Sequence, residues 1–416
     1  MKPSLALDQS IILTQHDEVV NLLLELTAPP APAVDRAPLD IALAVDRSGS
    51  MSGTPLAAVR RAVIELVRVA GPQDRIAVVS FDNEVQTVLP LEHHEIDRVR
   101  DRISNIHSGG STNLSGGWLK AFEILSAAPV VAGRAPALKR IIVLTDGHAN
   151  SGVKDPETLC TMTRGANGHG ISTSMIGFAD GYDETLLAGM ADAGGGNDYW
   201  CAGPDQALQV FNQEFAGLAQ VVLQNLSVEI RPTESTATLE VLNEYDTSDV
   251  PGILGARQVL IGDACGSEVR KLVVRFTLRP RLLAGPFTVA NLTLRWASTV
   301  GSVELHELSI PVVVQATDHT SELRELDPDV TQQVLHLQVA NLRRAAVKLA
   351  RARDIEGARA LFNQAIAKLV ALGADPREIN ELVELAARLE NHNEFDLKAQ
   401  ASMSRSTTKG RLKRFD

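Results

Sequence analysis

Residues 40–51 read DIALAVDRSGSM, an apolar run that ends in a group of polar side chains. Three more apolar runs resemble it: RIAVVSF at 75–81, RIIVLT at 140–145 and ISTSMIG at 171–177. Nearly continuous apolar runs of this length are typical of strands covered on both faces. Amphipathic helical spacing occupies the stretches 56–70, 96–103 and 114–125 between them. We therefore predict a doubly wound, Rossmann-like α/β domain over residues 38–222, with ligands at the carboxyl ends of its parallel strands.

The segment that follows this domain has a different pattern. Between residues 223 and 318 helical spacing disappears, and six short strand-like runs alternate with Pro and Gly. This pattern predicts an antiparallel β-sandwich. Strands predicted over residues 1–37 would complete the sandwich, so that the α/β domain interrupts it in sequence.

Helical spacing returns in the last hundred residues of the sequence. Residues 319–395 predict a helical hairpin or bundle, in which Asp327, Asp354 and Asp375 are expected to cap helices. Residues 396–416 carry six Lys and Arg against two Asp and show no core pattern. We predict a flexible basic tail there.

Composition and charge exclude several classes of protein. The 416 residues include 40 Lys and Arg against 51 Asp and Glu, a net charge of −11. Such an acidic chain is a poor candidate for nucleic-acid binding, because that binding rests on neutralising phosphates with basic side chains. No run reaches the roughly 18 to 20 apolar residues of a membrane span, and the first residues lack a signal-peptide layout. The three cysteines are too scattered for a disulfide framework, so we expect a cytoplasmic protein.

The polar group after the first buried strand has the character of a cation site. Asp46, Ser48 and Ser50 alternate with other residues, so a tight turn can bring their side chains together. A carboxylate with hydroxyls suits a hard cation such as Mg²⁺, Ca²⁺ or Mn²⁺ better than Zn²⁺ or Cu²⁺. Thr112 in SGGSTN and Asp146 in LTDG are expected on the same edge of the sheet.

These segments resemble the metal-ion-dependent adhesion site of von Willebrand factor type A (VWA) domains. The DxSxS pattern falls on Asp46, Ser48 and Ser50, the threonine of the family on Thr112 and its distal aspartate on Asp146. Many relatives read GGTN where this chain reads GGSTN, so Ser111 stays an alternative to Thr112 as a ligand. The flanking layout is similar to that of bacterial intracellular relatives and of von Willebrand/Hint-related proteins, although no Hint-like segment is visible.

The resemblance implies a function as well as a fold. In the family such a site binds a divalent cation, usually Mg²⁺, and an Asp or Glu carboxylate of a protein partner completes the coordination. The resemblance therefore implies a non-enzymatic adaptor, that is, a cation-dependent protein-interaction module. The residues expected to contact the partner flank the ligands and are Arg47, Met51, Ser111, Asn113, Gly147 and His148.

Three alternatives stay open beside this hypothesis. Asp and Ser after a strand also commonly cap a following helix, with no metal involved. The chain could instead be an accessory subunit of an AAA+ ATPase or another modifying enzyme, as some VWA proteins are. A serine hydrolase using Ser50 is disfavoured, because no G-x-S-x-G elbow and no motif-placed His accompany it. The nucleotide-binding motifs G-x-x-x-x-G-K-[ST] and G-x-G-x-x-G are both missing from the sequence.

Overall fold

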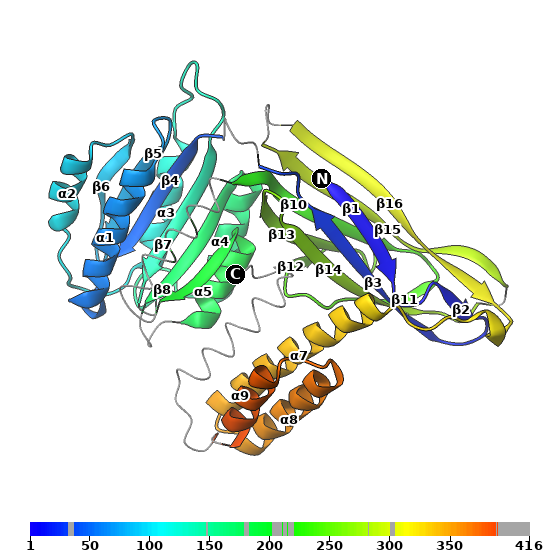
Figure 1. Ribbon diagram of the computed structural model, residues 1–416. Coiled ribbons are helices and arrows are strands. Elements are labelled where there is room, and N and C mark those ends of the chain that lie inside the picture. Colours follow the sequence, from blue (N-terminus) through cyan, green and yellow to red (C-terminus); the bar gives the residue numbers. More distant parts are fainter. Residues whose placement is uncertain are drawn as a thin grey trace.

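The structure of the chain is a computed structural model, which describes residues 1–31, 37–146, 149–178, 183–201, 210, 214, 220–281, 283–299, 304–387 and 389. Three groups of elements lie next to one another in this part of the chain: an α/β sheet with its helices, a pair of β-sheets, and a group of helices (Figure 1). No helix in these ranges is long and apolar enough to cross a membrane. The predicted basic tail at 396–416 lies outside the described residues.

The α/β sheet has the strand order β6-β5-β4-β7-β8-β9. Its strands are β4 (Leu39–Asp46), β5 (Arg75–Phe81), β6 (Val85–Glu92), β7 (Leu138–Thr145), β8 (Ile171–Phe178) and β9 (Gly195–Cys201). The strands predicted from apolar runs, β4, β5, β7 and β8, pair in parallel as expected. The sheet is mixed rather than parallel throughout, because the edge strand β6 pairs antiparallel with β5. The sequence pattern misses β6 and β9, since β6 is a partly exposed edge strand and β9 reads GGNDYWC.

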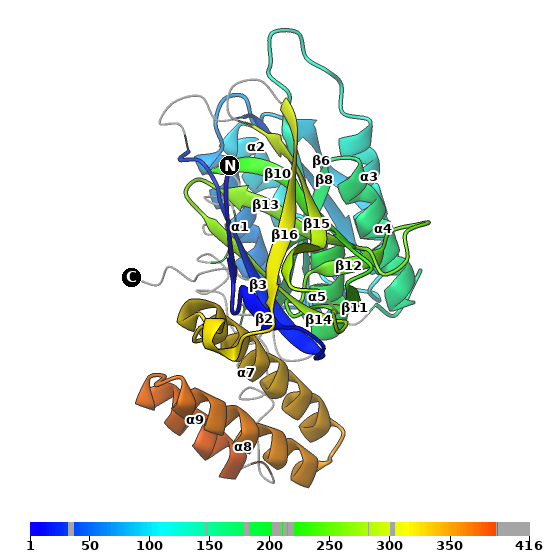
Figure 2. The same ribbon diagram turned by 90° about the vertical axis from the view of Figure 1, so that its right-hand side faces the viewer.

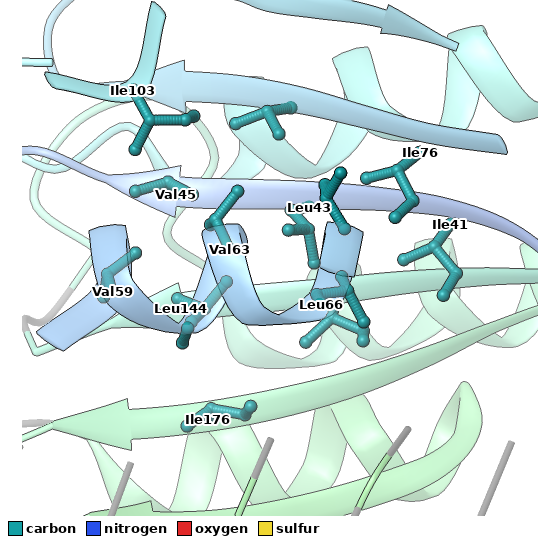
Figure 3. Close-up of a cluster of buried hydrophobic side chains, with 14 of the residues drawn as sticks. Ile41, Leu43, Val45, Val59, Val63, Leu66, Ile76, Ile103, Leu144 and Ile176 are labelled. Atoms are coloured by element: carbon teal, nitrogen blue, oxygen red, sulfur yellow. The ribbon is translucent and has the colours of Figure 1, made fainter. Parts of the chain in front are cut away.

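Helices cover both faces of this sheet. They are α1 (Thr54–Val69), α2 (Ile96–Ser104), α3 (Leu114–Ser126), α4 (Pro156–Gly168) and α5 (Glu184–Ala193), with a short 3₁₀ helix η1 (Gly49–Met51) before α1. Ile41, Leu43 and Val45 of β4 pack with α1 and α2 (Figure 3), whereas Ala42 and Ala44 pack with α3, α4 and α5. Side chains of β4 thus alternate between two cores, which explains its uninterrupted apolar sequence.

Two further sheets share one apolar core. The first has the order β1-β3-β14-β11, with β1 (Lys2–Leu7), β3 (Glu18–Thr27), β14 (Val269–Leu278) and β11 (Thr236–Val241). The second has the order β12-β13-β10-β15-β16-β2, with β12 (Asp246–Asp249), β13 (Arg257–Cys265), β10 (Val221–Pro232), β15 (Gly285–Ser298), β16 (Glu304–Thr317) and β2 (Ile11–Leu13). Strands from residues 1–27 therefore lie in the same sheets as strands that follow the α/β domain. The strands of the two sheets pair antiparallel as predicted except at one place, where β2 pairs in parallel with β16.

The helices near the end of the described chain are α7 (Pro328–Arg351), α8 (Ile355–Ala371) and α9 (Pro376–Ala387), preceded by the 3₁₀ helix η2 (Thr320–Glu322). Asp327 and Asp354 cap α7 and α8 as predicted, because their carboxylates accept backbone N–H bonds from the first turn. Apolar side chains of the helices form their own core around Phe362. The first half of α7 packs through Val330 and Leu337 on the sheet that contains β3. The group is thereby attached to the β-sheets.

A buried carboxylate lies at the end of the α/β sheet opposite to the carboxyl ends of its strands. Asp40, at the start of β4, accepts bonds from Arg75 (2.9 and 2.6 Å) and from Arg134 (2.7 Å). Burial alone would raise the pKa of Asp40, but the bonds from the two arginines outweigh it and hold that pKa below its ordinary value. The ionised carboxylate is therefore stabilised by folding.

Asp40→Asn tests this assignment through pH. A carboxyl whose pKa is lowered by folding stabilises the native state above its unfolded pKa of about 3.9, and this contribution is lost as the pH falls through the folded pKa. We expect Asp40→Asn to lower the free energy of unfolding by about 2 kcal/mol at pH 7. The difference should shrink below pH 4. Urea unfolding of both proteins across this range measures it, and a pH-independent difference would contradict the assignment.

Candidate metal centre

The carboxyl ends of three neighbouring strands meet at one edge of the α/β sheet, and predicted ligands follow two of them. β4 ends at Asp46, β7 leads into Asp146, and β5 leads into Asp82. Backbone bonds join the loops that follow: Arg47 N–H donates to Phe81 O (2.9 Å), Gly109 N–H to Arg47 O (2.8 Å) and Gly49 N–H to Gly110 O (3.2 Å). The loop before α3, which carries Thr112, is therefore held against the loop after β4.

A chain of polar contacts connects the two carboxylates. Ser48 Oγ lies 3.2 Å from Ser50 Oγ, and Ser50 Oγ donates to Asp146 Oδ1 (2.8 Å). Asp46 accepts from Ser48 N–H (2.8 Å) and from Thr145 Oγ1 (2.5 Å). We call Asp46, Ser48, Ser50 and Asp146 the strand-end cluster. The short turn that the sequence predicted between the serines is the 3₁₀ helix η1.

The electrostatics of the strand-end cluster favour a cation. Asp46 is fully buried and Asp146 nearly so. Burial raises the pKa of each carboxyl, and the negative charge of Asp146 raises the pKa of Asp46 further. Among the residues that the structure describes, no Lys, Arg or His pairs with either carboxylate. A bound divalent cation would offset these two charges, and the set of carboxylate and hydroxyl oxygens fits a hard cation.

Thr112 and Ser111, the two alternatives for one ligand, have different surroundings. Thr112 is buried, its N–H donates to Asn150 Oδ1 (2.7 Å), and its carbonyl accepts from the N–H groups of Asn150 and Ser151 (3.2 Å each). Ser111 is half-buried, and both its N–H and its hydroxyl donate to Asn83 Oδ1. The hydroxyl of Ser111 is thus already engaged by the loop after β5. This difference favours Thr112 as the ligand.

The residues predicted to contact a partner differ in their burial and in their hydrogen bonds. Arg47 is half-buried and donates to Asp82 (3.1 Å), and Asn113 caps α3 by accepting from Gly116 N–H (3.0 Å). Met51 is completely buried in the core beneath α1. The position of Met51 in η1 turns its side chain inward, so its contact with a partner stays a prediction that this burial does not support. The other two residues in this prediction, Gly147 and His148, lie outside the described residues.

Two residues of the site were not predicted from the sequence. Thr145 holds Asp46 through its hydroxyl, and Asn150 holds the backbone of Thr112 through its amide. Thr145 carries a weak signal, since it is a polar residue at the end of an apolar run and directly precedes Asp146. Asn150 carries none, because its partner lies 38 residues away in sequence.

Comparisons with known proteins concern the domain that carries the strand-end cluster. The family model of the von Willebrand factor type A domain matches residues 40–213. The uncharacterized protein sll0103 of Synechocystis sp. is 25% identical over 385 residues, which cover 89% of each protein. Among solved structures, "von Willebrand factor type A from Catenulispora acidiphila" superposes with a TM-score of 0.78 at 16% identity, covering 97% of this chain and 96% of that one.

A second solved structure, the ArnB paralog VWA2 from Sulfolobus acidocaldarius, has a TM-score of 0.65 at 17% identity and covers 98% of both chains. At these identities the likeness concerns the fold alone, and it extends over the β-sheets and helices as well as the α/β sheet. The match of the family model identifies residues 40–213 of this chain as a von Willebrand factor type A domain.

Proposed function

We propose that the chain is a non-enzymatic protein-interaction module in which the VWA domain holds Mg²⁺ and binds a carboxylate of a protein partner. The proposed ligands are Asp46, Ser48, Ser50, Thr112 and Asp146. The observation that carries the proposal is the bond from Ser50 Oγ to Asp146 Oδ1 (2.8 Å), because it joins two buried carboxylate-bearing strand ends through a pair of serines. Ca²⁺ and Mn²⁺ are alternative occupants, since both accept the same oxygen donors.

Asp46 and the two serines of the strand-end cluster have different parts in this proposal. Thr145 and the backbone of Ser48 hold the carboxylate of Asp46 in one orientation before any ion arrives. The hydroxyls of Ser48 and Ser50 are neutral donors, so they add ligands without adding charge. Mg²⁺, when bound, supplies the positive charge that attracts an Asp or Glu side chain of the partner. The buried surroundings strengthen that attraction, because the effective dielectric constant is lower than in water.

Ser50→Ala tests the part given to the hydroxyls, and Ser52→Ala is its matched control. Ser52 is an exposed serine two residues further along the same loop. We expect Ser50→Ala to weaken Mg²⁺ binding about tenfold, because one ligand and its hydrogen bonds disappear. Ser52→Ala should leave the affinity within about twofold. Isothermal titration calorimetry measures both, and equal affinities in the two variants would count against Ser50 as a ligand.

The partner and the absence of catalysis can be examined together. We expect partner capture by the full-length chain in Mg²⁺ and its loss in EDTA, with Asp46→Ala as the non-binding control. An AAA+ ATPase among the captured proteins would support the alternative of an accessory subunit. A fluorophosphonate probe should leave Ser50 unlabelled, whereas labelling would identify a reactive serine and contradict the non-enzymatic assignment.

A cytoplasmic location is part of the same proposal. Its support is that Cys160, Cys201 and Cys265 are all free thiols, as expected in a reducing compartment. The relation to bacterial intracellular VWA proteins and to von Willebrand/Hint-related proteins stays a prediction.

A further inference from the structure

Strand β16 forms a long free edge of the second β-sheet. It pairs with β15 along most of its length, but on its other side it meets only the three-residue strand β2, at residues 315–317. Residues 305–314 have no partner on that side among the described strands. In Figure 2 β16 runs down the front of the molecule with no other element over it. Unpaired N–H and C=O groups on such an edge are a template for another strand.

The contacts with β2 reveal which backbone groups of β16 face the free edge. Gln315 N–H donates to Ser10 O, and Thr317 O accepts from Thr14 N–H, each at 2.9 Å. The backbone N–H and C=O groups of odd-numbered residues therefore point away from β15. Residues 304–312 and 313–316 each pair one-to-one with β15, and the extra residue between these two stretches is Val289 on β15, so the alternation of β16 itself continues along the strand. The N–H groups of Leu305, Ser309 and Val313 therefore point to the free edge.

Two exposed apolar side chains on this edge strand lie at equal distances along the sequence from Ser309. Leu305 is 87% exposed and Val313 is 48% exposed. Each is four residues from Ser309, and Ser309 is also near the middle of the unpaired stretch. If a second copy of the strand pairs antiparallel with Ser309 opposite Ser309, then Leu305 of each copy lies opposite Val313 of the other. Both apolar residues would be covered by cross-strand contact.

The charges on the strand are compatible with the same register. Glu307 accepts from Arg295 Nε (2.7 Å) on β15, so its charge is already paired. In the Ser309-centred register Glu307 lies opposite Pro311, and no acidic residue on this face meets another. Pro311 has no N–H and removes one hydrogen bond on each side of the centre, while the bonds of Leu305, Ser309 and Val313 are retained.

We propose that the chain forms a two-fold symmetric dimer in which β16 pairs with β16 of a second copy, centred on Ser309. Two six-stranded sheets would become one continuous sheet. β16 lies on the side of the β-sheets away from the α/β sheet, which contacts β13 (Figure 1). The dimer therefore leaves both VWA domains at its outer ends, where two binding sites can act on one multivalent partner.

Sedimentation equilibrium of the full-length chain tests this proposal. We expect a concentration-dependent dimer in the natural sequence and a dissociation constant raised about tenfold or more by Ser309→Pro, because two symmetric hydrogen bonds are lost together. No residue that the structure describes accepts from the N–H of Ser309, so proline is compatible with the edge strand. Ser309→Ala keeps the N–H and is the matched control, with an unchanged dissociation constant. A chain that stays monomeric at every concentration, or equal dimerisation of all three proteins, would overturn the proposal.

Disulfide crosslinking tests the register separately. In the variant with Leu305→Cys and Val313→Cys, the two positions are eight residues apart in one strand, about 26 Å, so they cannot bridge within a chain. In the proposed dimer position 305 of one copy lies opposite position 313 of the other copy. The two Cα atoms are about 5.5 Å apart, a separation that suits a disulfide. We expect a covalent dimer under mild oxidation. The single variant Glu307→Cys, which faces Pro311, should give none, and equal crosslinking in both would refute the register.

Discussion

Asp46→Asn is expected to lower the affinity of the chain for Mg²⁺ at least about a hundredfold. The substitution keeps the size of the side chain and removes one of the two negative charges that would offset the ion, in a site where Asp46 is completely buried. Isothermal titration calorimetry gives the affinity. At a Mg²⁺ concentration of about 100 times the dissociation constant, the natural chain should also gain about 2.7 kcal/mol in its free energy of unfolding, and the variant should gain almost none.

Two controls separate loss of the ion from loss of the fold. Asp82→Asn changes another carboxylate at the same edge, one that pairs with Arg47 and is not a proposed ligand. We expect it to bind Mg²⁺ as the natural chain does. In EDTA, Asp46→Asn should unfold within about 1 kcal/mol of the natural chain, because the pKa of Asp46 is raised by burial and a neutral amide is no costlier to bury. Unchanged Mg²⁺ affinity in Asp46→Asn would contradict the assignment.

Asp263→Ala is expected to lower the free energy of unfolding by about 3 to 5 kcal/mol. Asp263 on β13 accepts from Arg140 Nη2 on β7 (2.9 Å), from Ser172 Oγ (3.3 Å) and from Asn225 N–H (3.2 Å). It therefore joins the second β-sheet to the α/β sheet, and both Arg140 and Asp263 are buried. Truncating the carboxylate leaves the guanidinium of Arg140 buried without this partner. Removing one member of a buried ion pair destabilises a protein more than replacing both members, because an uncompensated charge stays buried.

The expected loss in the free energy of unfolding is larger than the net contribution of the ion pair to stability. Burial raises the pKa of Asp263 even though Arg140 acts to lower it, so part of the attraction only compensates for the burial. Replacing both residues with apolar ones, Arg140→Met and Asp263→Leu, should therefore recover most of the loss. Asp249→Ala breaks an exposed pair with Arg257 and should cost less than about 1 kcal/mol. Urea unfolding compares the variants, and a loss for Asp263→Ala as small as that for Asp249→Ala would contradict the account.

Local sequence predicted those parts of the fold in which one stretch of chain determines its own structure. The continuous apolar runs identified β4, β5, β7 and β8, because strands covered on both faces have no polar alternation. Parallel pairing of β4 and β7 then predicted that the polar residues at the ends of these two strands lie close together at one edge of the sheet. Asp327 and Asp354 marked helix starts for an equally local reason, since a cap bonds only to the next turn.

Features that depend on distant partners could not be predicted in this way. β6 and β9 carry little apolar pattern, because edge strands are covered on fewer sides than central ones. The parallel pairing of β2 with β16 joins residues about 300 positions apart. Met51 looked like a loop residue beside the ligands, but the helical turn of η1 places it in the core. Asn150 reaches Thr112 only once the loops before α3 and after β7 are folded together.

A crystal structure of the chain with Mn²⁺, in which anomalous scattering locates the ion, tests most directly whether the strand-end cluster binds a divalent cation. We expect one strong anomalous peak within bonding distance of oxygens of Asp46, Ser48 and Ser50, with Thr112 rather than Ser111 turned toward it. The same crystal grown from Asp46→Asn should show no peak there. Saturating Mn²⁺ that leaves the strand-end cluster without a peak, in crystals where the cluster is accessible to solvent, would contradict the account.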